Sequence, residues 1–380
     1  MTDRSSATRS KPRVLFVSRT RYRLPLGASL AQKWDALAAE LELRVLATSA
    51  GRPSREGAFV LVPPTRPAAL AGLFFWLGLP LRVARLLRSF RPDAVVTQSP
   101  YEAAAVLLAR RATRSRTRVV TDVQGDWRTA TRLYGSPLRT ALRPLADAAA
   151  AAALRRVDAV RTISPYTSRL VRELGLEPAG TFPTFVDLRA FSGRDPVEPA
   201  ERPVALFVGV LEPYKNVDGL AEAWRLVARR LPDAELHVVG KGSREDVVRA
   251  LLRDCPDSTR WTRELDASGV AAALDEATLL VLPSRSEGMG RVVIEAFCRA
   301  RPVVGTRVGG IADLVEDGVS GVLVEPGVSE ALAEALERLL TDRELARELG
   351  ARAHARVQPW LQTPEEFASR TRALVDELCR

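Results

Sequence analysis

Short apolar runs alternate with helical patterns along the first half of the chain. Buried strands are predicted by runs of about six apolar residues, which lie at 13–18, 43–48, 58–63, 94–99, 118–123 and 158–164. Between these runs, apolar residues spaced as on one helix face predict helices, the clearest at 29–41 and in the alanine-rich stretch 145–156. Alternation of this kind predicts a parallel sheet that helices cover on both faces.

The same pattern stops and then restarts. Proline, glycine and charged residues replace the periodicity at 187–203, which we interpret as a linker between domains. Strands are predicted again at 203–209, 234–240, 277–284 and 302–306, with helices at 216–231, 244–253 and from about 291. The chain is therefore expected to have an α/β fold with two doubly wound, Rossmann-like domains, at 13–190 and 191–360.

The two ends of the chain differ in character. Residues 1–12 are polar and lack the apolar core of a signal peptide, so they are expected to form a disordered tail. A Thr-x-x-Glu capping box opens a helix at 363–378, and we expect the segment 361–380 to pack back on the N-terminal domain. The most apolar stretch, 68–81, is shorter than the roughly 20 residues that span a bilayer.

Composition narrows the class of protein. Of the 380 residues, 46% are hydrophobic and 27% charged, which is typical of a globular protein. The net charge of +10 favours anionic partners. Cysteines and histidines occur without the spacing of metal ligands, so neither a metal site nor a disulfide framework is expected, and a cytoplasmic setting is the simplest. They are Cys255, Cys298, Cys379, His237 and His354.

The segment SRSEGMGRVVIEAF, residues 284–297, places two carboxylates beside a predicted strand end. Glu287 stands among glycines, which let backbone approach a ligand closely, and a helix N-terminus near Gly290 favours phosphate. Glu295 falls on the second helical turn among apolar neighbours, where an unpaired carboxylate costs several kcal/mol. A hydroxyl-rich ligand is the favoured partner for Glu295, and an ion pair with Arg299 is the alternative.

These residues carry a family resemblance. The segment SEGMGRVVIEAFCRARPVVGTRVGGIADLVEDGVSGVLVEPG resembles the signature region of family 4 retaining glycosyltransferases, with their Glu-x7-Glu motif. VGVLEPYKNVDGLAEAW (208–224) is similar to their donor-phosphate segment, and RTISPYT (161–167) to the last strand of their acceptor domain. The resemblance implies the GT-B fold, in which two Rossmann-like domains face an interdomain cleft and a C-terminal helix crosses back.

The resemblance also implies roles for individual residues. Glu287 would contact donor-sugar hydroxyls, Glu295 the nucleotide ribose, and Lys215 the phosphates. The donor diphosphate would also be held by residues in three glycine-containing turns: Gly288, Met289, Gly290 and Arg291, Gly209, and Gly27 of the opposite domain. A solvated turn lysine and a plain loop glycine are the alternatives for Lys215 and Gly27. The family places contacts to the base near 261–264.

Two positions depart from the family pattern. Val210 stands where many relatives have a phosphate-binding arginine, which Arg291 or Lys241 would have to replace. Gln124 stands where many have a histidine on the acceptor side, so a histidine base is not expected. The leaving diphosphate can accept the proton instead, and Asp126 is our candidate for orienting the acceptor hydroxyl. Capping of a helix near Thr129 is the equally weighted alternative for Asp126.

The sequence thus predicts a retaining, metal-independent transferase without a cofactor. It would move a hexose from a nucleotide-diphosphate sugar to an acceptor hydroxyl of a polysaccharide, a lipid-linked molecule or a small molecule. The alternative is a catalytically impaired nucleotide-sugar-binding protein of the same fold. An epimerase or phosphorylase would lack this Glu-x7-Glu segment. Nucleic-acid binding is not expected, because no recognition motif accompanies the charge.

One predicted helix leaves its role open. In LRVARLLRSF (81–90) an apolar face and an arginine face alternate. The apolar residues are Val83, Leu86, Leu87 and Phe90, and the basic ones are Arg82, Arg85 and Arg88. The apolar face either packs on the sheet, which we favour, or docks on an anionic membrane surface, which would make the protein peripheral on the inner face of the membrane.

Overall fold

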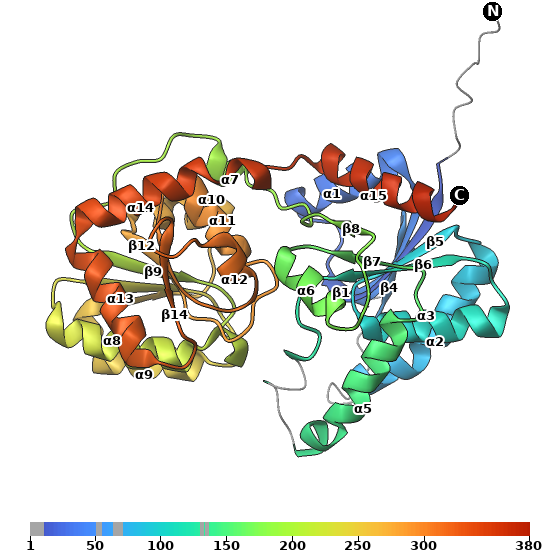
Figure 1. Cartoon of the computed structure of the whole chain (residues 1–380), viewed down its shortest axis with the longest axis horizontal. Helices are drawn as coiled ribbons and strands as arrows, with labels where there is room; N and C mark the ends of the chain where they lie inside the picture. The colour runs from blue at the N-terminus through green and yellow to red at the C-terminus, as the bar shows by residue number, and fades with distance from the viewer. Residues whose placement is uncertain (1–10, 51–54, 64–70, 130–132, 134–136) are drawn as a thin grey trace, which may run out of the picture.

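The computed structural model describes residues 11–50, 55–63, 71–129, 133 and 137–380. In these ranges the chain folds into two α/β domains, each built on one sheet with helices on both faces (Figure 1). Within the described residues every strand pair is parallel except one short antiparallel pair. The predicted class of two doubly wound domains is therefore confirmed.

The sheet of the first domain has the strand order β3-β4-β2-β1-β5-β6-β7-β8. Its strands are β1 (Arg13–Tyr22), β2 (Glu42–Ser49), β3 (Arg55–Glu56), β4 (Phe59–Val62), β5 (Ala94–Thr97), β6 (Arg118–Val123), β7 (Ala159–Thr162) and β8 (Gly180–Thr181). In the register, Leu15 lies beside Arg44 of β2 and Val95 of β5, which places β1 between these two strands.

Helices cover both faces of this sheet because side chains alternate between the faces along each strand. Leu15 and Val17 pack against α2 (Ala71–Ser89) and α3 (Pro100–Thr113), and α5 (Pro137–Leu154) continues this layer. Val14 and Phe16, which alternate with Leu15 and Val17 along the strand, pack with α1 (Ala28–Glu40) and α15 (Pro364–Leu378) on the opposite face.

The second domain has the strand order β11-β10-β9-β12-β13-β14. Its strands are β9 (Val204–Val208), β10 (Glu235–Val239), β11 (Thr259–Thr262), β12 (Leu279–Leu282), β13 (Val303–Thr306) and β14 (Gly321–Val324). Its helices are α8 (Val217–Arg230), α9 (Glu245–Asp254), α10 (Ala267–Glu276), α11 (Arg291–Cys298), α12 (Gly309–Leu314), α13 (Ser329–Thr341) and α14 (Arg343–Ala355). The edge strands β11 and β14 were not predicted, because neither forms a run of six apolar residues.

The linker between the domains is held to the second domain by a buried arginine. Arg299 is fully buried, and its guanidinium contacts the Asp275 carboxylate at 2.6 Å. It also donates to the carbonyl oxygens of Phe191, Arg194 and Asp195, at 3.4, 2.8 and 3.1 Å. The linker therefore runs a fixed course, and its first part forms the short helix α7 (Arg189–Ser192).

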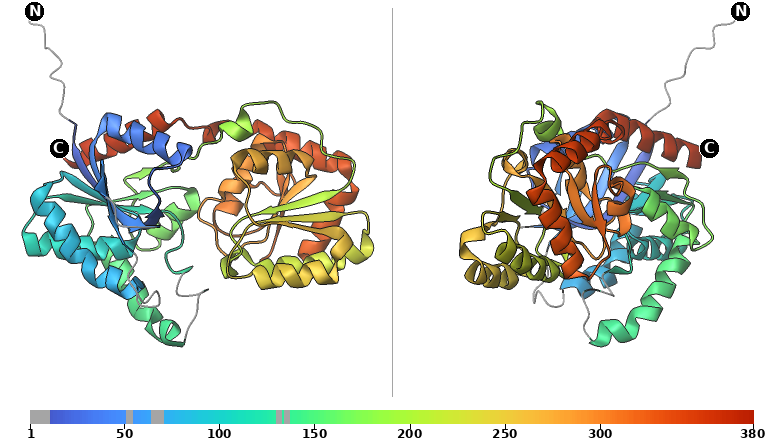
Figure 2. Two further views of the ribbon diagram at one scale, coloured as in Figure 1. Left: turned by 180° about the vertical axis from the view of Figure 1, so that it is seen from behind. Right: turned by 60° about the vertical axis from the view of Figure 1, so that its left-hand side comes forward.

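The last helix returns to the first domain. Its N-terminus carries the predicted capping box, in which Thr363 and Glu366 exchange side-chain to backbone hydrogen bonds. α15 then lies along α1 (Figure 2). The ring of Phe367 is contacted by two cations of the first domain, with Lys33 and Arg161 each 5.3 Å from its centroid. The chain thus crosses between the domains twice, once before β9 and once before α15.

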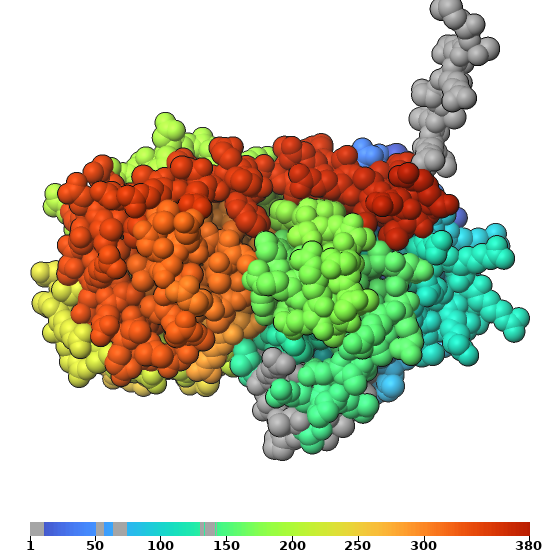
Figure 3. Space-filling model, in the orientation of Figure 1, coloured from blue at the N-terminus to red at the C-terminus, as the bar shows by residue number. Residues whose placement is uncertain are grey.

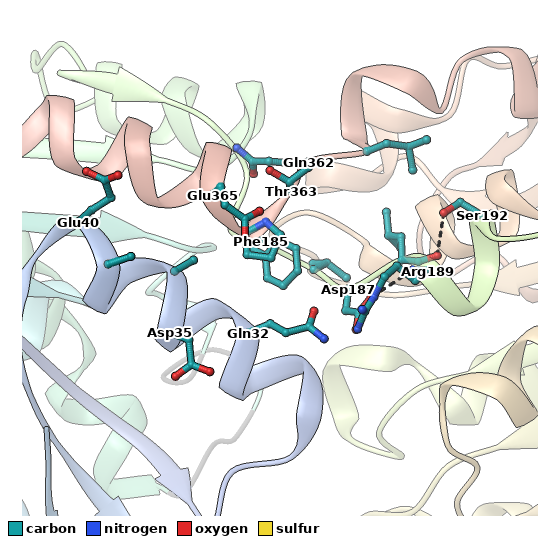
Figure 4. Close-up of a pocket in the computed structure, with 16 residues that line it drawn as sticks. Gln32, Asp35, Glu40, Phe185, Asp187, Arg189, Ser192, Gln362, Thr363 and Glu365 are labelled. Carbon is teal, nitrogen blue, oxygen red and sulfur yellow. Dashed lines mark hydrogen bonds and ion pairs between the residues drawn. The ribbon is translucent and has the colours of Figure 1, made fainter. Parts of the chain in front are cut away.

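A groove of about 770 Å³ lies where the two crossings pass each other. It is lined by residues of α1, of 185–192 and of 361–365 (Figure 4). Asp187 and Arg189 form an ion pair on one wall, at 2.8 Å. None of the residues predicted to bind donor or acceptor lines this groove.

Replacing Arg299 is expected to destabilise the second domain strongly. Arg299→Ala would remove the buried cation from three linker carbonyls and from Asp275, which would keep the exposed Arg194 as a partner. The expected loss is about 3 kcal/mol, the lower end for a buried ion pair broken on one side. Urea unfolding followed by circular dichroism measures the change. Arg347→Ala, at an exposed position of α14, is the matched control and should move the midpoint little; equal midpoints for the two variants would contradict this role.

Candidate functional site

The predicted glycine turn joins β12 to α11 at the carboxyl edge of the second sheet. Gly290 is the N-cap of α11 and adopts a left-handed backbone conformation, φ 73° and ψ 50°, which favours glycine. No side chain caps the helix. Its first N–H groups therefore have no capping side chain and can point toward an anion, which the helix dipole also favours.

Lys215 and Glu287 form an ion pair in front of this turn. The Lys215 Nζ atom lies 2.5 Å from Oε2 of Glu287, although the residues are far apart in sequence. Their side chains are only 9% and 16% exposed, so the pair is shielded from water. β9 and β12 are neighbours in the sheet. The segments after them therefore meet, and the Arg285 N–H donates to the Tyr214 carbonyl at 2.7 Å.

Glu295 is buried and forms an ion pair with Arg291, one helical turn before it. Its side chain is 4% exposed, and its Oε1 accepts a hydrogen bond of 2.7 Å from Arg291 Nε. The alternative of a pair with Arg299 is wrong, because Arg299 turns to Asp275 and the linker. Burial raises the pKa of Glu295, and the nearby Arg291 charge acts in the opposite direction. Arg291 itself is 65% exposed.

The glycine turn is pressed against the acceptor-side loop of the first domain. A Cβ atom on Gly288 would come within 2.0 Å of the Gln124 carbonyl oxygen, so only glycine fits there. The Ser164 hydroxyl donates to the Gly288 carbonyl at 3.0 Å, and the hydroxyls of Thr129 and Ser286 lie 2.8 Å apart. The structure therefore brings Gln124 and the Glu287 segment together.

Several residues of this interface were missed by the sequence argument. The Gly310 N–H donates to the Glu287 carbonyl at 2.9 Å, and a Cβ on Gly309 would lie 2.1 Å from that oxygen. Asp313, in the same helix α12, accepts hydrogen bonds from the Tyr166 N–H and from Arg169 of α6 (Pro165–Arg172). The space-filling view shows α6 and α12 in contact (Figure 3). The Gly-Gly pair at 309–310 was the only signal in the sequence.

Asp126 has a local structural role. Its Oδ1 accepts hydrogen bonds from the Arg128 N–H at 2.9 Å and from Arg128 Nε at 2.7 Å. Its backbone carbonyl accepts from the Thr129 N–H, so Asp126 orders the turn that follows β6. Gln124 is exposed. Gly27 is the N-cap of α1, and a Cβ there would meet nothing within 4 Å.

The cations near Val210 are engaged elsewhere. Val210 is 47% exposed, in a turn where the Leu211 N–H donates to the Lys241 carbonyl. Lys241 forms an ion pair of 2.6 Å with Glu264, beside the segment expected to contact the base. Gly209 lies next to the Lys215 side chain: a Cβ atom on Gly209 would stand 3.5 Å from Cε of Lys215. Met289 is buried behind the turn.

Two family models match the chain, and they divide it as the two sheets do. "Glycosyl transferase 4-like domain" matches residues 27–182, and "Glycosyl transferases group 1" matches residues 190–356. The chain belongs to the family 4-like, group 1 glycosyltransferases. Its GT-B fold agrees with this assignment.

The curated relatives match only part of the chain, and the chain spans about half of their length or less. The alpha-D-kanosaminyltransferase of Streptomyces kanamyceticus is 33% identical over 155 residues, 40% of this chain and 40% of that protein. The D-inositol 3-phosphate glycosyltransferase of Geodermatophilus obscurus is 33% identical over 233 residues, 55% of this chain. The matched region spans about half of that relative, 51%.

Solved structures match nearly the whole length of the chain. Sucrose-phosphate synthase from Thermosynechococcus elongatus superposes with a TM-score of 0.78 and 20% identity, covering 97% of this chain and 99% of that one. HepE of Anabaena, in complex with UDP and glucose, superposes with a TM-score of 0.68 and 16% identity, covering 96% and 100%. Identities this low establish the fold alone.

The described residues contain neither a cluster of metal ligands nor a membrane-spanning helix. Among these residues, no group of three or more His, Cys, Asp or Glu side chains is arranged to hold a metal ion. Within the same residues, no helix is both long enough and apolar enough to cross a bilayer. His237 lies in β10, within the strand predicted at 234–240, and is buried.

A methyl group at Gly288 is expected to separate the domains. Gly288→Ala places a Cβ 2.0 Å from the Gln124 carbonyl, so one side of the contact must move. Small-angle X-ray scattering should show a larger radius of gyration. Gly125→Ala is the matched control across the same contact, because its Cβ would lie at an ordinary 3.6 Å from Gly288. Scattering of Gly288→Ala identical to that of the parent would refute the contact.

Proposed function

We propose that the protein is a retaining glycosyltransferase that moves a hexose from a nucleotide-diphosphate sugar to an acceptor hydroxyl without a metal ion. The observation that carries the proposal is the shielded Lys215–Glu287 pair in front of the uncapped N-terminus of α11. A lysine and free helix-end amides in one place suit a diphosphate, and a carboxylate beside them suits sugar hydroxyls.

In this proposal the donor lies across the carboxyl edge of the second sheet. The amides at 288–291 and Lys215 hold the diphosphate, and Glu287 accepts hydrogen bonds from the sugar. Glu295 accepts the two ribose hydroxyls, which offset the cost of its burial. Arg291 now occupies one oxygen of Glu295. Because Arg291 is mostly exposed, its guanidinium is free to shift to the phosphates when ribose arrives.

The chemistry needs no enzyme base. The bond between the sugar anomeric carbon and the diphosphate oxygen breaks, and the acceptor oxygen bonds to that carbon from the same face. The acceptor proton passes to the departing diphosphate oxygen. The protein stabilises the charge that develops there through Lys215 and the helix-end amides, and domain contacts such as Gly288 with Gln124 exclude water. The turn that Asp126 orders would present the acceptor hydroxyl.

The identity of the substrates is proposed only as a class. HepE was solved with UDP and UDP-glucose, which supports a nucleotide-sugar donor for this fold. One relative is named for glycosyl transfer involving inositol 3-phosphate and another for the sugar kanosamine, so the names do not point to one acceptor. A role in building cell-envelope polysaccharide belongs to this proposal, and its support is the shared fold of the lipopolysaccharide outer core galactosyltransferase WaaB.

A catalytically impaired binding protein is the second candidate. It is favoured by Val210, which supplies no cation, and by the carboxylates that hold Lys241 and Arg291 in the structure. Incubation with UDP-sugars and GDP-sugars separates the candidates. Nucleotide release that depends on the protein supports the transferase, and binding without release supports the impaired protein.

Removing either donor-side charge is expected to abolish transfer. Lys215→Ala removes a cation from the leaving diphosphate, which costs about 100-fold or more in turnover. Glu295→Ala removes the proposed ribose contact and should act through donor affinity as well. Nucleotide release measures both, with thermal unfolding to confirm the fold. The control is Glu334→Ala, at an exposed position of α13. Parental turnover in either site variant would defeat the assignment.

Chelation is expected to leave activity unchanged. The charge on the leaving group is assigned to Lys215 and backbone amides, so excess EDTA should not lower the rate of nucleotide release. Re-addition of magnesium or manganese should likewise have no effect. A rate that falls with EDTA and returns with metal would show that the proposed metal independence is wrong, while leaving the assigned fold and family untouched.

A further inference from the structure

The two helical layers of the first domain differ in charge. The α2 sequence contains three arginines and no acidic residue. The only acid in α3 is Glu102, which is buried, and the only acid in α5 is Asp147, which pairs with Arg143. The opposite layer, α1 with α15, carries several acids: Asp35, Glu40, Glu365, Glu366, Asp376 and Glu377. The α2–α3–α5 layer therefore forms the basic face of this domain.

Large apolar side chains protrude from the same layer. Phe74, Leu77 and Leu81 of α2 are 44%, 66% and 66% exposed, and they lie on one side of the helix at spacings of three and four. Leu108 of α3 and Leu145 of α5 are 58% and 69% exposed. Of the nine exposed large hydrophobic residues within the described ranges, these make up five.

This exposed row is additional to the face of α2 that fills the core. Val83 and Leu87 are buried against the sheet, as we favoured for the apolar face of 81–90, and Phe75 and Leu79 extend this buried row. α2 thus has two apolar rows, of which the core uses one. A second row left in water costs solubility and gains nothing from folding, which marks it as an interaction surface.

The row continues into basic residues. Arg85 and Arg88 follow Leu81 along the same side of α2, and both are exposed. Between α3 and α5 a groove of about 790 Å³ is lined by Leu108 and by arginines that include Arg111 and Arg114. None of these four arginines forms an ion pair with a described residue. Their charge is therefore available to an anionic partner.

We propose that the α2–α3–α5 face docks on an anionic lipid bilayer. The apolar row would enter the boundary between headgroups and acyl chains, and the arginines would contact lipid phosphates. Charge complementarity favours this occupant. A nucleic acid or other soluble polyanion would satisfy the arginines but leave Phe74, Leu77 and Leu81 in water.

The apolar end of this face lies toward the acceptor side of the first domain. Helices after parallel strands begin at the carboxyl edge of the sheet, so Phe74 and Leu77 are nearer that edge than Arg88 is. The rings of Trp76 and Tyr101 are in contact, at 6.3 Å between centroids. Tyr101 follows β5 and Asp126 follows β6, which are neighbours in the sheet, so both residues lie at this edge.

Docking in this orientation would bring the acceptor-side loop next to the bilayer. A lipid-linked acceptor could then present its hydroxyl near Asp126 without leaving the membrane. This last step rests on the proposed function, whereas binding to the bilayer does not. The two can fail separately, because vesicle binding is measured without donor or turnover.

The test is co-sedimentation of the full chain with lipid vesicles. One set consists of phosphatidylcholine alone, and the other also contains phosphatidylglycerol. The chain should pellet with the anionic vesicles and remain largely in the supernatant with the neutral ones. Added salt should weaken the binding. Failure to pellet with anionic vesicles would overturn the proposal. So would binding to heparin, a soluble polyanion, that anionic vesicles do not displace.

Paired variants separate the two contributions. Arg85→Gln with Arg88→Gln should weaken partitioning roughly 30-fold, since each basic residue near an anionic surface contributes about 1 kcal/mol. Leu77→Ser with Leu81→Ser should reduce binding at least tenfold while leaving its salt dependence. Thermal unfolding confirms that each variant folds.

The controls lie on the second domain and the linker. Arg229→Gln with Arg253→Gln removes two exposed arginines of α8 and α9 that form no ion pair with described residues. Val197→Ser with Val328→Ser removes two exposed apolar side chains. Both should sediment as the parent does. Equal losses in the controls and in the α2 variants would mean that binding is diffuse, and would overturn the assignment of this face.

Discussion

The ion pair between Lys215 and Glu287 is the contact on which the donor side of the molecule depends. It joins the segments that follow β9 and β12, and it stands where little water reaches it. Shielded pairs of this kind gain little net stability, because both ions have lost their hydration. The pair is therefore easily rearranged by a ligand that carries its own charge and hydroxyls. A diphosphate would take the place of Glu287 as the partner of Lys215, and a sugar would take the place of Lys215 as the partner of Glu287.

The parallel sheets could be predicted from the sequence because their buried strands consist of apolar runs. Such runs can be recognised without knowing the tertiary structure. The Lys215–Glu287 contact did not follow, since it depends on β9 and β12 being neighbours in the sheet, and no local pattern encodes strand order. The alternative pair of Glu295 with Arg299 was wrong for a related reason. A helical carboxylate can pair four residues in either direction, and Arg299 was already committed to the buried linker, which left Arg291.

Hydrophobic periodicity predicted only one of the two apolar rows of α2. It indicated one apolar face at 83–90, and that face does fill the core. The exposed row that begins at Phe74 could not be recognised, because an apolar residue in a helix carries no mark of whether sheet, solvent or partner faces it. Only the burial of Phe75 and Leu79 on the other side separates the two rows. The acid-free sequence of α2 was the single local sign that this helix differs from α1 and α15.

The two crossings between the domains have a mechanical consequence. A chain that passes once between two bodies lets them swivel and drift in many directions, but a second passage removes most of that freedom. Here both passages border one groove, which α1 also lines. The line through the two crossings therefore acts as a hinge axis. Separation of the domains at Gly288 would then be a rotation about that axis. The Gln124 loop would move along an arc toward and away from the glycine turn.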